Sequence, residues 1–171
     1  MSHYTLVPLS GYAAPVGSAL AAMVDSRQRT LDAIAQLADE QVDTIALGLD
    51  NTVGATLYHI AAIEADWLYY DLLEEDYPAW MGELFPFEVR EENGRLSPAP
   101  GSTVAQHIDR LAAVRAHFLQ DIKRLDPASF DQPNSIAEHP STPRWIFHHL
   151  GQHEAEHRGQ IQSILTALRA Q

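Results

Sequence analysis

The feature that most restricts the possible folds is a helical spacing of apolar residues in four separate segments. Apolar side chains recur at steps of three and four residues within residues 18–39, 53–73, 103–125 and 142–170, which is the period of an amphipathic helix. No segment alternates apolar and polar residues as a half-buried strand does. The sequence therefore predicts an all-α fold, an up-and-down four-helix bundle that forms one domain over residues 1–171.

Three of these segments begin with helix-capping signals. Thr52 ends a capping signal before the second segment, and Thr103 and Gln106 have the spacing of a capping box before the third. The fourth opens with Thr142 as N-cap and Pro143 at the first helical position, which is a favoured start. These residues fix the predicted helix starts.

Long loops are expected between the second and third helices and between the third and fourth. Residues 74–101 form a connection longer than a bundle needs, and it holds four aromatic residues, Tyr77, Trp80, Phe85 and Phe87. Loops of this length are usually functional or mobile. Two interpretations stay open with equal weight: a surface flap that covers one end of the core, and a lid over a substrate.

Composition excludes several classes of function. Eleven Lys and Arg against 23 Asp and Glu give a net charge of −12, which repels nucleic-acid phosphates and anionic lipid surfaces. We therefore expect no nucleic acid and no membrane as partner, and the absence of a signal peptide or spanning segment favours a cytoplasmic protein. Because there is no cysteine, a metal ion must be held by nitrogen and oxygen ligands.

Two histidines of the fourth segment occupy predicted core positions. At 100° per residue from His157, His153 falls within the apolar band of that helix, which comprises Ile146, Leu150, Ile161, Ile164 and Leu168. Residues four apart on a helix lie about 6 Å apart at Cβ, so both imidazoles can reach one ion. His149 lies about 80° from this line and is a weaker candidate.

Buried histidines often only hydrogen-bond to their neighbours, but two in succession favour a metal ion, because an ion satisfies two acceptors at once. His59 in the second segment is a candidate third ligand. It shares a helix face with Ala55, Ala62, Ile63 and Trp67. From the pattern alone, His59 could equally be an ordinary core residue.

Residues 153–157 also match H-E-x-x-H, the helical motif of zinc peptidases, in which Glu154 would be the general base. Those enzymes take a third ligand from further along the chain. Residues 158–171 contain no His, Asp or Glu, and no strand is evident to hold a peptide. The peptidase interpretation is therefore disfavoured.

Two stretches of the sequence resemble the signatures of one family. Residues 145–161, with their H-x-x-x-H pair, are similar to the last-helix signature of the DinB/YfiT-like family of metal-binding proteins. Residues 51–67, with one histidine and a later tryptophan, are similar to its second-helix signature. The resemblance implies a four-helix bundle with a metal ion, commonly zinc or nickel, bound by His59, His153 and His157. His148 and His149 lie outside that pattern.

The resemblance also implies candidate activities and partners. Some members are thiol S-transferases that join bacillithiol or mycothiol to electrophiles, many have no assigned activity, and homodimers are frequent. The family's name refers to DNA-damage induction. For Arg158, Gly159 and Gln160 we weigh support of the metal site against packing, and favour packing, with Gly159 allowing a close approach of helices.

Three neutral imidazoles would leave an ion with an open position, as catalytic sites do. Such a position lowers the pKa of bound water or binds a thiol as thiolate. We predict a divalent-metal-dependent thiol S-transferase that joins a small-molecule thiol to an electrophile. The alternatives are a non-enzymatic metal-binding stress-response protein and a metal-dependent hydrolase. Zinc is the favoured ion, with nickel, iron, cobalt and manganese as alternatives.

Overall fold

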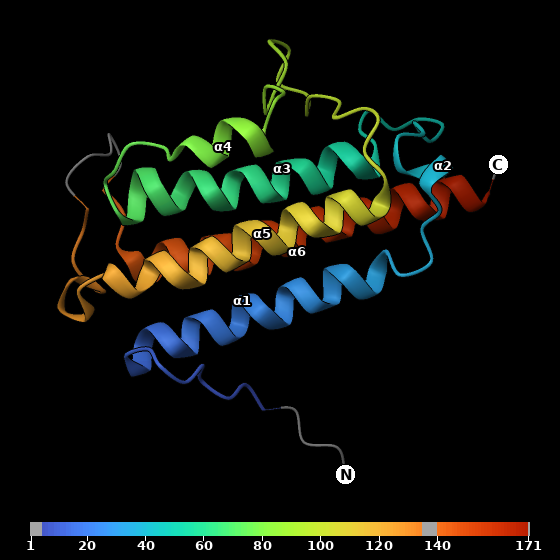
Figure 1. The fold of residues 1–171 in the computed structure, drawn as a ribbon. Helices are drawn as coiled ribbons and strands as arrows, with labels where there is room; N and C mark the ends of the chain where they lie inside the picture. Colours follow the sequence, from blue (N-terminus) through green and yellow to red (C-terminus); the bar gives the residue numbers. More distant parts are fainter. Residues whose placement is uncertain (1–4, 135–139, 171) are drawn as a thin grey trace.

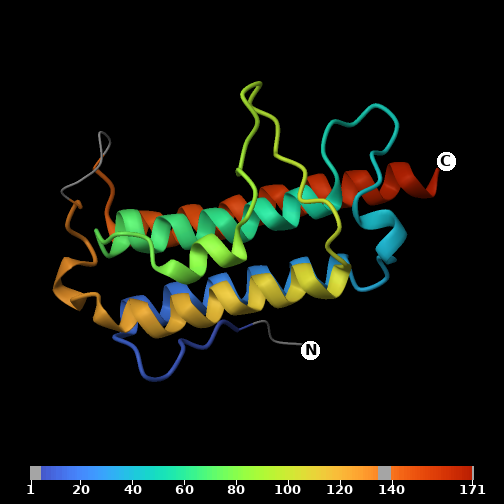
Figure 2. The ribbon, with the colours of Figure 1, turned by 45° about the horizontal axis from the view of Figure 1, so that its top comes forward.

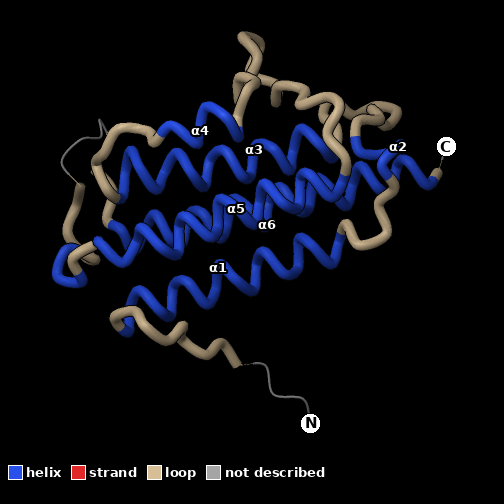
Figure 3. Tube along the Cα trace, in the orientation of Figure 1, coloured by secondary structure: helices blue, strands red, loops and turns tan. Residues whose placement is uncertain are grey.

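The computed structural model describes residues 5–134 and 140–170 (Figure 1). Within these ranges the chain forms helices and loops and no strand, as Figure 3 shows. The four long helices are α1 (Ala14–Ala33), α3 (Val53–Asp66), α5 (Val104–Asp121) and α6 (Pro143–Arg169). The prediction of an all-α fold with four long helices is confirmed.

The bounds of the helices differ from the sequence prediction in two places. The first helix begins earlier than expected and ends at Ala33, so residues 34–38 form a turn before the short helix α2 (Asp39–Val42). The predicted loop 74–101 contains a further helix, α4 (Ala79–Leu84). The end of α3 continues as a π-helix (Trp67–Leu72), and 3-10 turns occupy Ile122–Arg124 and Pro127–Ser129.

All three predicted N-caps are present. The hydroxyl oxygen of Thr52 accepts a hydrogen bond of 3.0 Å from the backbone N–H of Ala55, and Thr142 caps α6 in the same way. Thr103 and Gln106 form the complete capping box, in which each side chain accepts from the other residue's backbone N–H. Because a cap satisfies donors that the first helical turn leaves unpaired, these residues set the helix starts.

The helices α3 and α5 run in the same direction. Arg110, near the start of α5, lies over the ring of Tyr58, near the start of α3. Tyr69, just beyond α3, donates to Asp121 at the end of α5, and Figure 1 shows both helices running from right to left. The strict up-and-down alternation expected from the sequence is therefore not observed between them.

This parallel arrangement explains the length of the connection between α3 and α5. The chain has to return along the bundle before α5 begins, and α5, with 18 residues, is about 27 Å long at about 1.5 Å per residue. The connection crosses over the α3 side of the bundle and carries α4 with it (Figure 2). A hairpin turn could not make this connection.

The helices pack as neighbours in the order α1, α6, α3, α5. The core consists of two clusters along the bundle, one built around Leu20 and Phe118 and the other around Leu57 and Ile161. Trp80 of α4 packs against both clusters. Part of the aromatic connection therefore packs against the core, although the flap interpretation expected it to cover one end only.

Across the described residues, no helix combines the length and the apolar character needed to cross a bilayer.

Candidate metal centre

His59 lies in the middle of α3, the helix with the most completely buried surface. Its side chain is fully buried, at 0% exposure. Burial, followed by the charges of His157, His153 and Arg90, lowers the pKa of His59 to about 3. The imidazole is therefore neutral at physiological pH, the form in which histidine binds metal ions.

His153 and His157 project from successive turns of α6 toward His59. His157 is 9% exposed and His153 is half-buried. Burial is the largest cause that lowers the pKa of both groups, to about 3 for His153. Three neutral imidazoles from two antiparallel helices thus meet at one place.

The meeting point is formed by the Nε2 atoms. The Nε2 of His153 lies 3.2 Å from that of His59 and 3.1 Å from that of His157, and one ligand atom from each of the three residues lies within 4.8 Å of the others. A neutral imidazole nitrogen carries either one hydrogen or one lone pair, so hydrogen bonds cannot satisfy all three atoms together.

The donor set fits a metal ion. Nitrogen ligands about 2.0–2.1 Å from a tetrahedral zinc ion lie about 3.3 Å from one another, close to the spacing of these atoms. The three residues offer nitrogen ligands alone, and an ion held by them has at least one position left for a substrate or water. The structure therefore brings together all three residues singled out from the sequence.

Gln160 orients one of these imidazoles. Its Oε1 lies 2.9 Å from Nδ1 of His157, so Nδ1 donates the hydrogen and Nε2 keeps its lone pair for an ion. The Nδ1 of His59 is buried without a hydrogen-bond partner in the described part of the chain. Within residues 158–160, which sequence reasoning assigned mainly to packing, Gln160 supports the site.

The other two residues of that segment have separate roles. Arg158 donates from Nη1 to the backbone oxygen of Ser26 at 3.1 Å, and so ties α6 to α1. Gly159 is exposed, and a Cβ built there would meet no atom of another helix within 4 Å. The expected close approach of helices at Gly159 is therefore wrong, while the packing role holds for Arg158.

His149 belongs to an aromatic group beside the centre. Its ring stacks on Trp145 with 4.9 Å between centroids and lies equally far from Trp67. Its centroid is 6.0 Å from that of His153, but it is not part of the group of three that could hold an ion. The helical spacing of the sequence made His149 a weaker candidate ligand, which agrees with this position. His148 is exposed.

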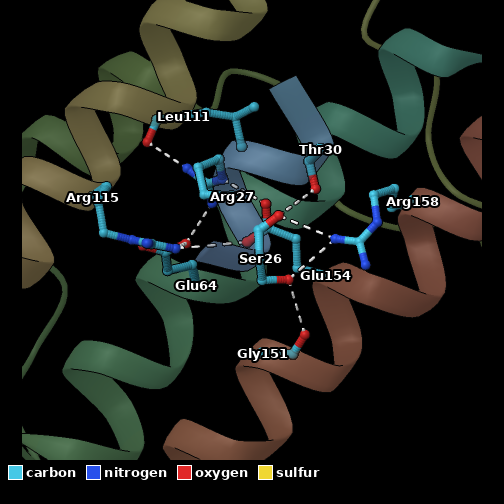
Figure 4. A network of polar contacts seen from close by, with 9 residues as sticks. All are labelled: Ser26, Arg27, Thr30, Glu64, Leu111, Arg115, Gly151, Glu154 and Arg158. Carbon is cyan, nitrogen blue, oxygen red and sulfur yellow. Dashed lines mark hydrogen bonds and ion pairs between the residues drawn. The ribbon is translucent and has the colours of Figure 1, made fainter. Parts of the chain in front are cut away.

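Glu154 belongs to a buried ionic network (Figure 4). It is 3% exposed and accepts a hydrogen bond of 2.7 Å from Nε of Arg27. Arg27 also donates to Glu64 of α3 at 2.6 Å, and Glu64 accepts from Arg115 of α5. A carboxylate held in this way is not free to act as the general base of a peptidase, which agrees with the sequence argument.

Sequence reasoning missed Arg90. It lies in the connection between α3 and α5, with Nη2 3.5 Å from Nε2 of His59. Arg90 also lines a pocket of about 480 Å³, so it joins that pocket to the three histidines. The remaining lining residues come from α3 and the connection: Ala62, Ile63, Asp66, Tyr77, Met81, Phe85, Glu88 and Val89. The only signal in the sequence was the aromatic character of this connection.

The connection is fastened to α3 next to this pocket. The hydroxyl of Tyr58 donates to the backbone oxygen of Phe87 at 2.7 Å and accepts from its N–H at 3.0 Å. Tyr77 donates to Asp66. Trp80 packs against the core and Tyr77 lines the pocket. The interpretation of the connection as a lid over a substrate stays a prediction.

Comparison with known proteins identifies one matching family. The family model of the DinB superfamily matches residues 22–161, a stretch that includes all three histidines and Gln160. A search of curated proteins gave no match.

Proposed function

The chain belongs to the DinB superfamily, and on this basis we propose that it is a divalent-metal-dependent enzyme, a thiol S-transferase acting at His59, His153 and His157. The observation that carries the proposal is the convergence of three neutral imidazoles, with ligand atoms within 4.8 Å of one another, next to a pocket. Structural zinc sites are normally closed by four protein ligands, whereas three ligands with an open position are typical of catalysis.

The residues of the site prepare it for this chemistry. A bound divalent ion supplies positive charge that favours the thiolate form of an incoming thiol at neutral pH. Burial keeps the three imidazoles neutral, and Gln160 holds the ring of His157 with Nε2 facing its neighbours. The connection over α3 supplies part of the pocket wall through Tyr77, Met81 and Phe85.

The thiol has to come from solution because the chain contains no cysteine. In the proposed reaction the thiol sulfur forms a bond to an electrophilic carbon of the second substrate. The leaving group departs with its electron pair, and the thiol proton passes to solvent. The apolar wall formed by Ala62, Ile63 and Met81 suits an electrophile with an apolar body. Zinc is our first choice of ion, with nickel, iron, cobalt and manganese as alternatives.

The experiment combines metal content with turnover. We expect the purified protein to bind one divalent ion per chain, as measured by elemental analysis, and His59→Ala and His157→Ala to lose it. His148→Ala is the matched control, because His148 is an exposed residue of the same helix as His157. Circular dichroism of each variant separates loss of the ion from loss of the fold.

Turnover is measured with monochlorobimane as electrophile and a panel of small thiols. We expect a fluorescent thioether whose formation requires the ion and is lost in His157→Ala. Wild-type protein that binds no divalent ion under any loading condition would refute the metal site. Protein that binds the ion but transfers none of the thiols would refute the transferase. It would leave a metal-binding stress-response protein or a hydrolase, and ester hydrolysis by the loaded protein would identify the latter.

A further inference from the structure

Arg90 places a fixed positive charge beside a site that would itself hold a cation. Its Nη2 lies 3.5 Å from Nε2 of His59, and its charge contributes to lowering the pKa of all three histidines. The three histidines are neutral and bring no negative charge. A guanidinium and a divalent ion so close together repel each other unless an anion lies between them.

The position of Arg90 is set by its own loop. Nη1 donates to the backbone oxygen of Gly94 at 3.0 Å, and Arg90 pairs with Leu96 in an isolated antiparallel bridge. The loop turns at Gly94, whose φ of +84° is a conformation that glycine adopts readily. The guanidinium is therefore held toward His59 by its loop.

Arg90 has no carboxylate partner among the residues the structure describes. Its two hydrogen-bond partners there are the Gly94 oxygen and the imidazole of His59. The other arginine of this loop, Arg95, forms an ion pair of 2.8 Å with Asp50. Arg90 thus keeps donors that can bind a ligand, at the point where the pocket meets the histidines.

We infer that Arg90 is a specificity-determining residue that binds a carboxylate of the thiol substrate, while the thiol sulfur lies toward the three histidines and the rest of the molecule occupies the pocket. This inference rests on the proposed function. Guanidinium and carboxylate form charge-assisted hydrogen bonds with defined geometry. The substrate would supply the negative charge that the protein's own residues do not place between Arg90 and the ion.

The test measures binding, separately from turnover. Cobalt-loaded protein is titrated with 3-mercaptopropionate, which carries a carboxylate, and with 3-mercapto-1-propanol, its neutral counterpart, and the visible absorption of cobalt reports each dissociation constant. We expect the carboxylate thiol to bind about tenfold or more tightly than the alcohol, the effect of one hydrogen bond between charged groups.

Arg90→Gln should bring the ratio of the two dissociation constants close to one while leaving the affinity for the alcohol unchanged. Arg90→Lys should restore part of the preference because it restores the charge. Arg95→Gln, in the same loop, is the matched control and should keep the wild-type ratio. Cobalt content, measured for every variant, shows that the centre is intact.

Three results would overturn the inference. The ratio of the two dissociation constants could be near one in the wild-type protein, or it could be unchanged in Arg90→Gln. The third result is an equal loss of affinity for both thiols in that variant, which would indicate a structural role. A carboxylate preference that depends on Arg90, in a protein that transfers no thiol to monochlorobimane, would uphold the inference and refute the transferase. Turnover without such a preference would refute the inference alone.

Discussion

The buried ionic network of Figure 4 allows a quantitative test of how the bundle is held together. Two arginines and two glutamates balance one another within it. Glu64 accepts from Arg27 at 2.6 Å and from Arg115 at 2.5 and 2.9 Å, and its side chain is 4% exposed. Glu64→Gln would leave two buried cations with one anion, Glu154. Removing one partner from a buried pair costs about 3–5 kcal/mol, and we expect a loss of this size in the free energy of unfolding.

The assay is urea denaturation followed by circular dichroism at pH 7, with the protein free of metal so that ligand binding does not add to stability. Glu75→Gln is the matched control. Glu75 pairs with Arg124 at 2.6 Å, but their side chains are 45% and 48% exposed, and exposed pairs contribute about 0–1 kcal/mol. The difference between these two substitutions isolates the effect of burial.

A double substitution makes the reasoning refutable. Glu64→Leu with Arg115→Met removes one charge of each sign and leaves the Arg27–Glu154 pair at 2.7 Å. We expect the double variant to be more stable than Glu64→Gln or Arg115→Met alone, because the remaining charges balance and apolar side chains fill the space. Two results would show that charge balance does not govern this site. One is a loss of unfolding free energy in the double variant equal to the sum of the losses of its two single substitutions, and the other is a loss below about 1 kcal/mol for Glu64→Gln.

The same network predicts the response to acid. Burial raises the pKa of Glu64, but the charges of Arg115 and Arg27 outweigh burial and leave that pKa below its ordinary value. A carboxyl whose pKa is lowered on folding stabilises the protein above its unfolded pKa, about 4.3, and this stabilisation is lost as the pH falls through the folded pKa. Glu64→Gln should lack this part of the acid transition.

Four further substitutions test single residues. Gln160→Ala should weaken metal binding by about 10–100-fold, as measured by chelator competition, because the tautomer of His157 is no longer fixed; unchanged affinity would contradict that role. Gly54→Ala should destabilise the protein by about 1–3 kcal/mol in urea denaturation, since its Cβ would lie 2.6 Å from Oδ1 of Asp43, whereas Gly159→Ala should stabilise it by about 0.5–1 kcal/mol. Burial, followed by the charge of Arg110, lowers the pKa of His107 to about 4. The stability that this neutral histidine provides is therefore complete above about pH 6.5 and is lost as the pH falls toward 4. His107→Gln should flatten this part of the plot of unfolding free energy against pH, and an unchanged plot would refute the assignment.

The long helices were predictable because burial on one face imposes a period on the sequence. The α6 band that includes Ile146, Leu150 and Ile161 is buried as expected, and the predicted caps at Thr52, Thr103 and Thr142 begin their helices. The end of α1 was not predictable in this way. The apolar residue Leu37 continues the helical spacing beyond Ala33, and no glycine or proline marks the turn that follows.

The direction of α5 was not predictable from periodicity, because an amphipathic face is the same for a helix read in either direction along the bundle. The length of residues 74–101 was the available signal, but it was interpreted from the sequence as a flap or a lid and not as a crossover. Helical spacing alone predicted only the two site residues that share one helix, His153 and His157. His59 lies on another helix, and its prediction depended on the family resemblance. Arg90 lies near His59 because of the path that its loop takes, and no local pattern in the sequence predicts that path.

The placement of the three ligands has a consequence for the life of the protein in the cell. His59 and His153 are 94 positions apart, and at about 5–20 residues per second a ribosome needs roughly 5–20 s to pass from one to the other. Until the last helix has been made, the nascent chain holds a single ligand of the centre. An ion held by all three histidines would therefore be loaded after synthesis, and its identity would depend on the ions then available and on the geometry of the finished bundle.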